Sequence, residues 1–450
     1  MKILVKYCAA LAVGCLLTAG AAAEETGVIS GVREVPVAPG CAATSVNNAV
    51  FRGSSLVSDS DHQFIVFYDP EGRVMVGRRA LGSDNTPGSD KVLASDKWEL
   101  NTTQYSGNVA DAHNVISLGI DGDGFLHLSF DHHGHPLRYA RSVAPGSLEF
   151  GPLEAMTGVD ESDVTYPDFY TLPDGDLLFV YRSGVSGRGN LVLNRYSVRE
   201  RRWSRIHDIL VDGEGQRNAY WQLCTDRNGV IHLSWVWRET WLVETNHDLC
   251  YARSRDGGRS WERSDGTPYT LPITAATAEV AVAIPQNSEL INQTSMSADA
   301  QGRPCIATYW RDSDSAVPQF QMVWHDGNGW QTSQVGNRTE PFSLSGGGTK
   351  MIPISRPACV WSERGMAVVF RDAERGSQLS VATLKAGDKE WKISDIGSVD
   401  LDAWEPTVDR NLWQRSGQLH IFTQPTRQGD GERVVAGAAP SMISITELTF

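Results

Sequence analysis

Histidines are concentrated in one stretch, DAHNVISLGIDGDGFLHLSFDHHGHPLRYARS, which runs from Asp111 to Ser142 and holds five of the chain's eleven. Near neutral pH an imidazole can move a proton or bind a metal. His127 lies in the strand-like run FLHLSFD, and the same position recurs as His232 and His420 in two similar runs. A residue repeated in this way is typical of a structural role, so we interpret these three as hydrogen-bonded histidines.

His113 and His133 differ from them because no other part of the sequence repeats either one. His113 precedes its strand in DAHN, and His133 follows it in DHHGH, where a glycine permits a sharp turn. Both could therefore reach the same mouth of a cleft. This pattern predicts an acid–base centre, while a zinc site and a solvated loop remain open alternatives.

The next two repeats add tyrosines and arginines in a shared register. Tyr166 precedes the run LLFVYR, which ends at Arg182, and Tyr220 and Arg238 hold the corresponding places around VIHLSWVWR. With the histidines, this set suits β-elimination on a uronic-acid polysaccharide. An arginine neutralises the carboxylate and stabilises the charge that develops when C5 loses its proton, and His or Tyr moves the protons. Glycoside hydrolysis needs a defined pair of carboxylates, and no pair is singled out here.

The elements that must position these residues follow one repeated pattern, a turn rich in Gly, Asp and Asn and then a short β-rich run. Short strands at regular intervals predict an all-β protein, a seven-bladed β-propeller, with an array of β-sandwiches as the alternative. No amphipathic helix is expected. The runs are QFIVFYD from Gln63, FLHLSFD from Phe125, DLLFVYR from Asp176, VIHLSWV from Val230, PCIATYW from Pro304, GMAVVFR from Gly365 and QLHIFTQ from Gln418.

Two further segments support a closed ring of blades. SRDGGRSW, from Ser254 to Trp261, fits the Asp-box pattern S-x-D-x-G-x-x-W, a structural hairpin turn that indicates an architecture and no particular reaction. TGVISGVREVPVA near the N-terminus and SMISITELTF at the C-terminus read as strands. We expect them to pair, because pairing the chain ends removes an open sheet edge.

The first 23 residues predict export. Lys2 and Lys6 precede an apolar run and a small-residue cleavage site, which is the pattern of a signal peptide at residues 1–23. The mature chain, residues 24–450, is then a single propeller domain in a secreted or periplasmic monomer. No later apolar run is long enough to span a membrane. Its five cysteines are an odd, scattered set, so we expect buried or metal-bound thiols rather than a disulfide framework.

The charge of the chain restricts its partners. The formal net charge is −14 and becomes −16 when the two leader lysines are removed. Such a chain is a poor partner for nucleic acid. An anionic substrate must meet a local basic pocket instead of a basic surface.

Three stretches resemble a known family. DAHNVISLGIDGDGFLHLSFDHHGHPLRYARS, TYPDFYTLPDGDLLFVYRSG and WVWRET with TNHDLCYARSRDGG are similar to the BNR-4 group of secreted β-propellers, and within it to ulvan lyases of polysaccharide lyase family 25, with family 24 related. The likeness runs from about Asn47 to the C-terminus. It implies a seven-bladed propeller with a substrate canyon across one face. It also implies cleavage of ulvan, a sulfated algal polysaccharide, between 3-sulfated rhamnose and a uronic acid, which leaves an unsaturated uronyl end.

The resemblance also implies roles for individual residues. The "HN" loop and the "DHH" segment place the family's two active-site histidines on His113 and His133. The spacing of sixteen residues between Tyr166 and Arg182 is kept. Proton abstraction and donation then belong to Tyr166 and His113, in an order left open. Arg182 neutralises the carboxylate. The residues expected to contact the sugar are His133, Tyr220 and Arg238.

Catalysis by this set requires no cofactor, but the resemblance implies a structural metal. In NHDLC, His247 stands three residues before Cys250, a spacing that can chelate zinc. His325 is the expected third ligand, and Cys224 or Cys305 the fourth. The alternative is a buried thiol beside a hydrogen-bonded histidine.

Other functions remain open at the level of sequence. One is a different uronate-directed enzyme on the same fold, either a rhamnosyl-glucuronate hydrolase or another lyase. A second is a sugar-binding propeller without catalysis, which would leave the set of His113, Tyr166 and Arg182 without a purpose. A sialidase is less consistent with the sequence, which shows no arginine triad.

Overall fold

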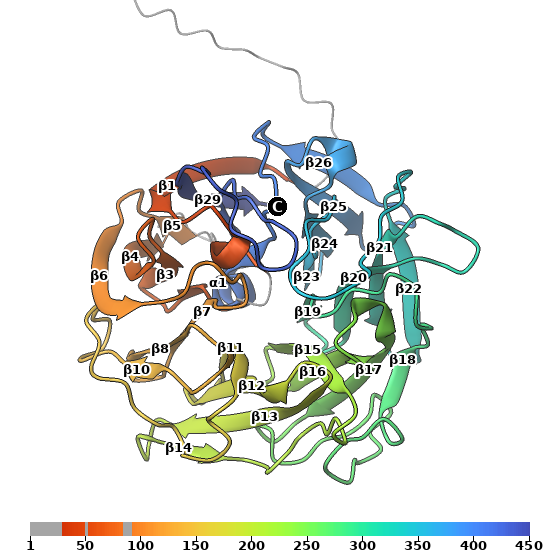
Figure 1. Ribbon diagram of the computed structural model, residues 1–450, viewed down its shortest axis with the longest axis horizontal. Coiled ribbons are helices and arrows are strands. Elements are labelled where there is room, and N and C mark those ends of the chain that lie inside the picture. The colour runs from red at the N-terminus through yellow and green to blue at the C-terminus, as the bar shows by residue number, and fades with distance from the viewer. Residues whose placement is uncertain (1–28, 50–52, 84–91) are drawn as a thin grey trace, which may run out of the picture.

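The computed structural model describes residues 29–49, 53–83 and 92–450, and the predicted signal peptide lies outside them. Six hydrogen-bonded sheets make up the described fold. They are arranged around a central axis (Figure 1), which confirms the all-β, propeller-like prediction. Each of the seven runs predicted as strands is a strand, namely β3, β8, β12, β16, β20, β24 and β28.

The first half of the chain forms three sheets. One contains β2 (Leu56–Ser58), β3 (His62–Tyr68), β4 (Arg73–Ser83), β5 (Val92–Ala94) and β6 (Glu99–Ser106), and the next contains β7 (Ile116–Ile120), β8 (Leu126–Phe130) and β10 (Tyr139–Arg141). A nine-stranded sheet contains β9 (His133–His135), β11 (Val164–Thr171), β12 (Leu177–Val185), β13 (Arg188–Ser197), β14 (Arg202–Arg205), β15 (Asn218–Thr225), β16 (Ile231–Arg238), β17 (Asn246–Ser254) and β18 (Glu279–Val282).

The second half forms three four-stranded sheets. They are β19 (Ser295–Ala298) with β20 (Pro304–Trp310), β21 (Gln319–His325) and β22 (Trp330–Val335); β23 (Ala358–Ser362) with β24 (Gly365–Phe370), β25 (Leu379–Lys385) and β26 (Lys392–Ile396); and β27 (Thr407–Val408) with β28 (Leu419–Thr423), β29 (Ser441–Thr449) and β1 (Gly31–Gly40). Strand β1 pairs antiparallel with β29, from Gly31 opposite Thr449 to Gly40 opposite Ser441. The predicted pairing of the two chain ends is therefore confirmed.

The innermost strands surround a cavity of about 570 Å³ on the axis. Its lining includes residues of β2, β7, β11, β15, β19, β23 and β27. Of these, β7, β11, β15, β19 and β23 are labelled near the centre of Figure 1. Sheets that share one central cavity must hold the loops at each of their ends around a common mouth. This arrangement brings residues that are far apart in sequence to one site.

One helix departs from the sequence prediction. Helix α1 (Arg410–Ser416) follows β27, and the carboxylate of Asp409 accepts a hydrogen bond from the backbone N–H of Leu412 at its N-terminus. Gly417 closes its C-terminus in a left-handed conformation. With only seven residues, the helix is too short to show a clear amphipathic period. Short 3-10 turns lie at Ser45–Asn47, Val243–Thr245 and Ala373–Arg375.

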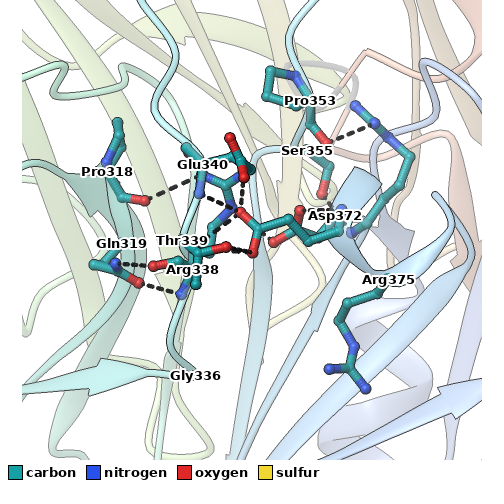
Figure 2. Close-up of polar contacts among 12 residues, drawn as sticks. Pro318, Gln319, Gly336, Arg338, Thr339, Glu340, Pro353, Ser355, Asp372 and Arg375 are labelled. Carbon is teal, nitrogen blue, oxygen red and sulfur yellow. Dashed lines mark hydrogen bonds and ion pairs between the residues drawn. The ribbon is translucent and has the colours of Figure 1, made fainter. Parts of the chain in front are cut away.

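Buried polar contacts connect neighbouring sheets at their ends, as Figure 2 shows around Arg338. The Nε of Arg338 donates to Asp372 at 2.7 Å, and its Nη2 lies 3.0 Å from the carboxylate of Glu374. Glu374 also accepts the backbone N–H groups of Thr339 and Glu340. Arg338 thereby ties the segment after β22 to the segment after β24.

The repeated histidines have the structural role that the sequence predicted. His127 contacts the hydroxyl of Tyr139 at 2.8 Å and the carboxylate of Asp121 at 3.0 Å, and His232 contacts Tyr251 at 2.7 Å. His420 lies beside the side chains of Gln63 and Arg79. All three are fully buried.

The Asp-box is also present: Asp256 accepts backbone N–H groups of Arg259 and Ser260, and Trp261 packs beneath the turn.

Candidate active site

His113 and His133 meet at one carboxylate. The Nδ1 of His113 lies 2.9 Å from one oxygen of Asp111, and the Nδ1 of His133 lies 2.6 Å from the other. The two rings are stacked, with centroids 4.0 Å apart and planes at 15°. A loop before β7 and the short strand β9 thus place the two unrepeated histidines side by side.

A second carboxylate reaches His113 from the opposite end of the chain. An oxygen of Glu432, in the loop between β28 and β29, lies 3.2 Å from the Nδ1 of His113. The same carboxylate accepts the backbone N–H of Thr349 at 2.6 Å and the Thr349 hydroxyl at 3.0 Å. Glu432 is therefore held in place by one loop while it contacts a histidine on another.

These carboxylates control the protonation of the pair. Burial alone would lower the pKa of His113, but hydrogen bonds to Asp111 and Glu432 raise it from 6.5 to about 9. Burial opposes ionisation of Asp111, yet its bonds to both histidines hold the pKa of this carboxyl well below its usual range. For His133, burial dominates and lowers the pKa. At neutral pH one ring of the stack is an imidazolium and the other is neutral.

Tyr166 stands next to this pair in a strained backbone conformation. Its φ is 59°, and it precedes Pro167 in a bulge where the register of β11 against β12 shifts between Thr165 and Asp168. A non-glycine residue in the left-handed region is costly, and such strain is concentrated at functional sites. The bulge turns the Tyr166 ring toward His113, 5.9 Å between centroids.

Arg182 packs over Tyr166 and has no carboxylate partner among the residues that the structure describes. Its guanidinium carbon lies 5.0 Å from the centre of the Tyr166 ring, and its Nη2 donates to the hydroxyl of Thr165 at 2.9 Å. The side chain is buried, and its Nε makes no hydrogen bond within the described part of the chain. A buried guanidinium with an unused donor is suited to bind an anionic group.

Tyr220 and Arg238 form a second pair of the same kind on β15 and β16. Arg238 lies over the Tyr220 ring, 4.4 Å from its centre, and donates to the side-chain oxygens of Asn246 and Asn292 at 2.7 and 2.5 Å. The hydroxyl of Tyr220 lies 3.2 Å from that of Ser186 and 3.4 Å from an Nη of Arg238. Although burial opposes it, the positive charges of Arg238 and Arg182 lower the pKa of Tyr220.

The structure therefore brings the six predicted substrate and catalytic residues into one continuous set of contacts. Tyr166 links the two halves, because its ring lies 5.9 Å from both His113 and Tyr220. Burial and the neighbouring Tyr220 raise the pKa of Tyr166. Sequence reasoning missed Glu432, Asn292 and Ser186, whose loops carry no repeated pattern. Asp111 had only a weak signal, its place two residues before His113.

The predicted zinc site is not assembled. Among the described residues, the one group of three or more His, Cys, Asp and Glu side chains with converging ligand atoms is Asp111, His113 and His133. His247 instead contacts Glu239 at 2.9 Å and Asp248 at 3.0 Å, and His325 packs edge-on against Trp330. Cys250 is buried and free, as are Cys41, Cys224, Cys305 and Cys359. The alternative of a buried thiol beside a hydrogen-bonded histidine describes His247 and Cys250.

The group that does converge could receive a metal cation only after a change of protonation. His113 must lose the proton that Asp111 and Glu432 stabilise before its lone pair can coordinate a metal. Asp111, His113 and His133 are therefore candidates both for proton transfer and for cation binding.

The chain belongs to the BNR repeat-containing family, whose model matches residues 62–338. Within that class the similar curated proteins are ulvan lyases. The long isoform from Alteromonas sp is 26% identical over 217 residues, which is 37% of this chain and 22% of the relative. The short isoform from Alteromonas sp. (strain LOR) is 25% identical over 219 residues, 37% of this chain and 42% of the relative. The matched part is thus less than half the length of these relatives.

Solved structures agree with the fold. The polysaccharide lyase Uly1 superposes with a TM-score of 0.65 at 14% identity, over 94% of this chain and 99% of that one. A family 25 ulvan lyase bound to -[GlcA(1-4)Rha3S]- gives 0.63 at 14% identity, over 91% and 95%. At such identities the likeness establishes the architecture alone.

The described residues contain no helix with the length and hydrophobicity needed to cross a membrane.

Proposed function

We propose that this protein is a polysaccharide lyase that cleaves ulvan by β-elimination. The observation that carries the proposal is Arg182, a buried cation that packs on Tyr166 and has no carboxylate partner among the described residues. A uronate carboxylate placed there would meet a guanidinium charge that no acidic side chain of the described residues neutralises. The ulvan lyase relatives support the same substrate class.

In the proposed reaction a base removes the proton from C5 of the uronic acid. The electron pair left on C5 forms the C4–C5 double bond while the C4–O bond to 3-sulfated rhamnose breaks, and an acid protonates the departing oxygen. Arg182 stabilises the negative charge that builds on the carboxylate during proton removal. The products are an unsaturated uronyl end and a new rhamnose end, and the step itself needs no metal.

The protonation states suggest which group does which task. His113 carries a proton at neutral pH, so we assign it to protonate the leaving oxygen. We assign proton abstraction to the pair of tyrosines, Tyr166 and Tyr220. The ring of Tyr166 lies next to His113. Arg182 and Arg238 lower the pKa of Tyr220 and so favour its ionised, basic form. His133, Tyr220 and Arg238 would also contact the sugar.

The proposal includes three broader features. The first is seven blades, because the nine-stranded sheet consists of two meanders joined by a single pair, Gly189 with Asn218. The second is export through a signal peptide at residues 1–23, and the third is action as a monomer. A structural zinc elsewhere would need ligands other than the set of His247, Cys250 and His325.

The test is to incubate the purified protein with ulvan and follow the near-ultraviolet absorbance of the unsaturated uronate. Absorbance that rises with the wild type and is lost in Tyr166→Phe, His113→Ala and Arg182→Ala supports the lyase. New reducing ends without absorbance would replace it with a hydrolase. Binding of ulvan without either signal would leave a sugar-binding propeller.

A further inference from the structure

Trp241 is exposed at the same end of the fold as the candidate active site. It lies three residues after Arg238, in the loop that joins β16 to β17, and its relative exposure is 60%. Among the described residues it is the one aromatic side chain with exposure that high. A single exposed hydrophobic side chain is ordinary on a protein surface, so the interest of Trp241 lies in its place beside the candidate active site.

The indole of Trp241 packs against the loop that contains Gly346 and Gly347. A Cβ on Gly347 would lie 2.5 Å from the Cε3 of Trp241, so the ring packs directly on the glycine backbone. Around this contact, the backbone N–H of Val243 donates to the carbonyl of Gly346, and the N–H of Gly346 donates to Glu244 at 2.9 Å. Gly187 in the β12–β13 turn approaches the backbone of Trp241 from another side. One part of the indole is covered and the rest is open to solvent.

The same loops connect Trp241 to the catalytic groups. Ser186, beside Gly187, contacts the hydroxyl of Tyr220. Two residues after Gly347, Thr349 binds the carboxylate of Glu432, which in turn reaches His113. Trp241 thus stands at the rim of the proposed site, on loops whose other contacts are inside it.

A cation lies on the loop that carries the indole. The Nζ of Lys350 is 3.5 Å from the point where a Cβ on Gly346 would stand, next to the glycine that carries the indole. No ion pair joins Lys350 to an acidic side chain within the residues that the structure describes. An exposed aromatic ring, and a lysine on the loop beneath it, match the chemistry of a sulfated sugar, whose ring has an apolar C–H face and whose ester is an anion.

We propose that Trp241 and Lys350 form a subsite for a sulfated pyranose unit of the substrate, outside the catalytic centre. The C–H face of the ring packs on the open side of the indole, and Lys350 pairs with the sulfate ester. The inference rests on the proposed function for the identity of the polymer, but the binding it describes does not require turnover.

Two kinds of measurement test it. With sulfated ulvan, Trp241→Ala is expected to raise KM on the order of tenfold and to leave kcat little changed. A tenfold change in affinity corresponds to about 1.4 kcal/mol, which is the free energy that one aromatic contact contributes. Lys350→Ala is expected to raise KM for sulfated ulvan and to leave KM for desulfated ulvan unchanged. Trp391→Ala, at a half-buried tryptophan just before β26, is a control for the loss of an indole elsewhere and should leave both constants unchanged.

Titration of sulfated ulvan oligosaccharides by calorimetry separates the subsite from the reaction. If the wild type binds them, Trp241→Ala binds them more weakly, and no cleavage occurs, the subsite stands and the lyase is wrong. If cleavage occurs and Trp241→Ala leaves KM and affinity at wild-type values, the subsite is wrong. An equal effect of Lys350→Ala on sulfated and desulfated polymer would overturn the sulfate contact.

Discussion

The rings of His113 and His133 lie stacked, 4.0 Å apart, and bind opposite oxygens of the single carboxylate of Asp111. Glu432 adds a second negative charge on the side of His113 only. Two chemically identical side chains therefore have opposite protonation states, which gives the site one proton donor and one neutral imidazole.

The activity should be lost at alkaline pH because of His113. Its pKa in the folded protein, about 9, lies above the ordinary value of 6.5. The ion pairs of His113 therefore contribute stability fully below about pH 6.5, and this contribution disappears as the pH rises through 9. We expect kcat with ulvan to fall above pH 9 in step with deprotonation of one imidazole, observed by NMR titration. An unchanged rate through that titration would exclude His113 as the acid.

Replacement of Glu432 by Gln should shift this alkaline limb to lower pH. The substitution keeps a hydrogen-bonding side chain on Thr349 and removes the charge that raises the pKa of His113. The matched control is Glu374→Gln, because Glu374 likewise accepts backbone N–H groups but contacts Arg338 and no histidine. A pH–rate profile that moves equally in both variants would show a general electrostatic effect instead.

Arg182→Lys should reduce kcat by roughly 10²–10³-fold, the usual effect of removing one donor that stabilises a developing charge. Lysine retains the charge but cannot donate to Thr165 and a carboxylate at once from a planar fork. Arg195→Lys on the neighbouring strand β13, where the arginine pairs with Asp174 and Asp176, is the control. Full activity of Arg182→Lys would show that Arg182 need not donate to Thr165 and to the substrate carboxylate at the same time.

Arg338→Met should destabilise the fold without changing the chemistry. It strands the buried carboxylate of Asp372, and breaking a buried ion pair typically costs about 3–5 kcal/mol. Denaturant unfolding should show the loss, and adding Asp372→Asn should recover part of it. The folded fraction should keep the wild-type kcat, and a large fall in kcat would mean that this cluster affects the site.

The sequence predicted more of the architecture than of the site. Strand runs and their turns recur, because each sheet needs the same inward-facing apolar pattern and the same tight connections, and the pairing of the chain ends followed from the need to close an edge. The structural histidines were recognisable since repetition itself marks a structural position. Helix α1 was not predicted because it is too short to show a period. The side chains of His247, Cys250 and His325 do not converge, since a short local spacing does not determine where side chains point.

The sequence by itself determined the class of fold and predicted six candidate residues that the structure brings together. Only the tertiary structure decided how those residues act. The charge of His113 depends on Glu432, more than three hundred positions away, and the exposure of Trp241 depends on a glycine in a loop from another sheet. Proton affinities and solvent exposure are set by neighbours in space, and in a ring of sheets those neighbours come from distant parts of the chain.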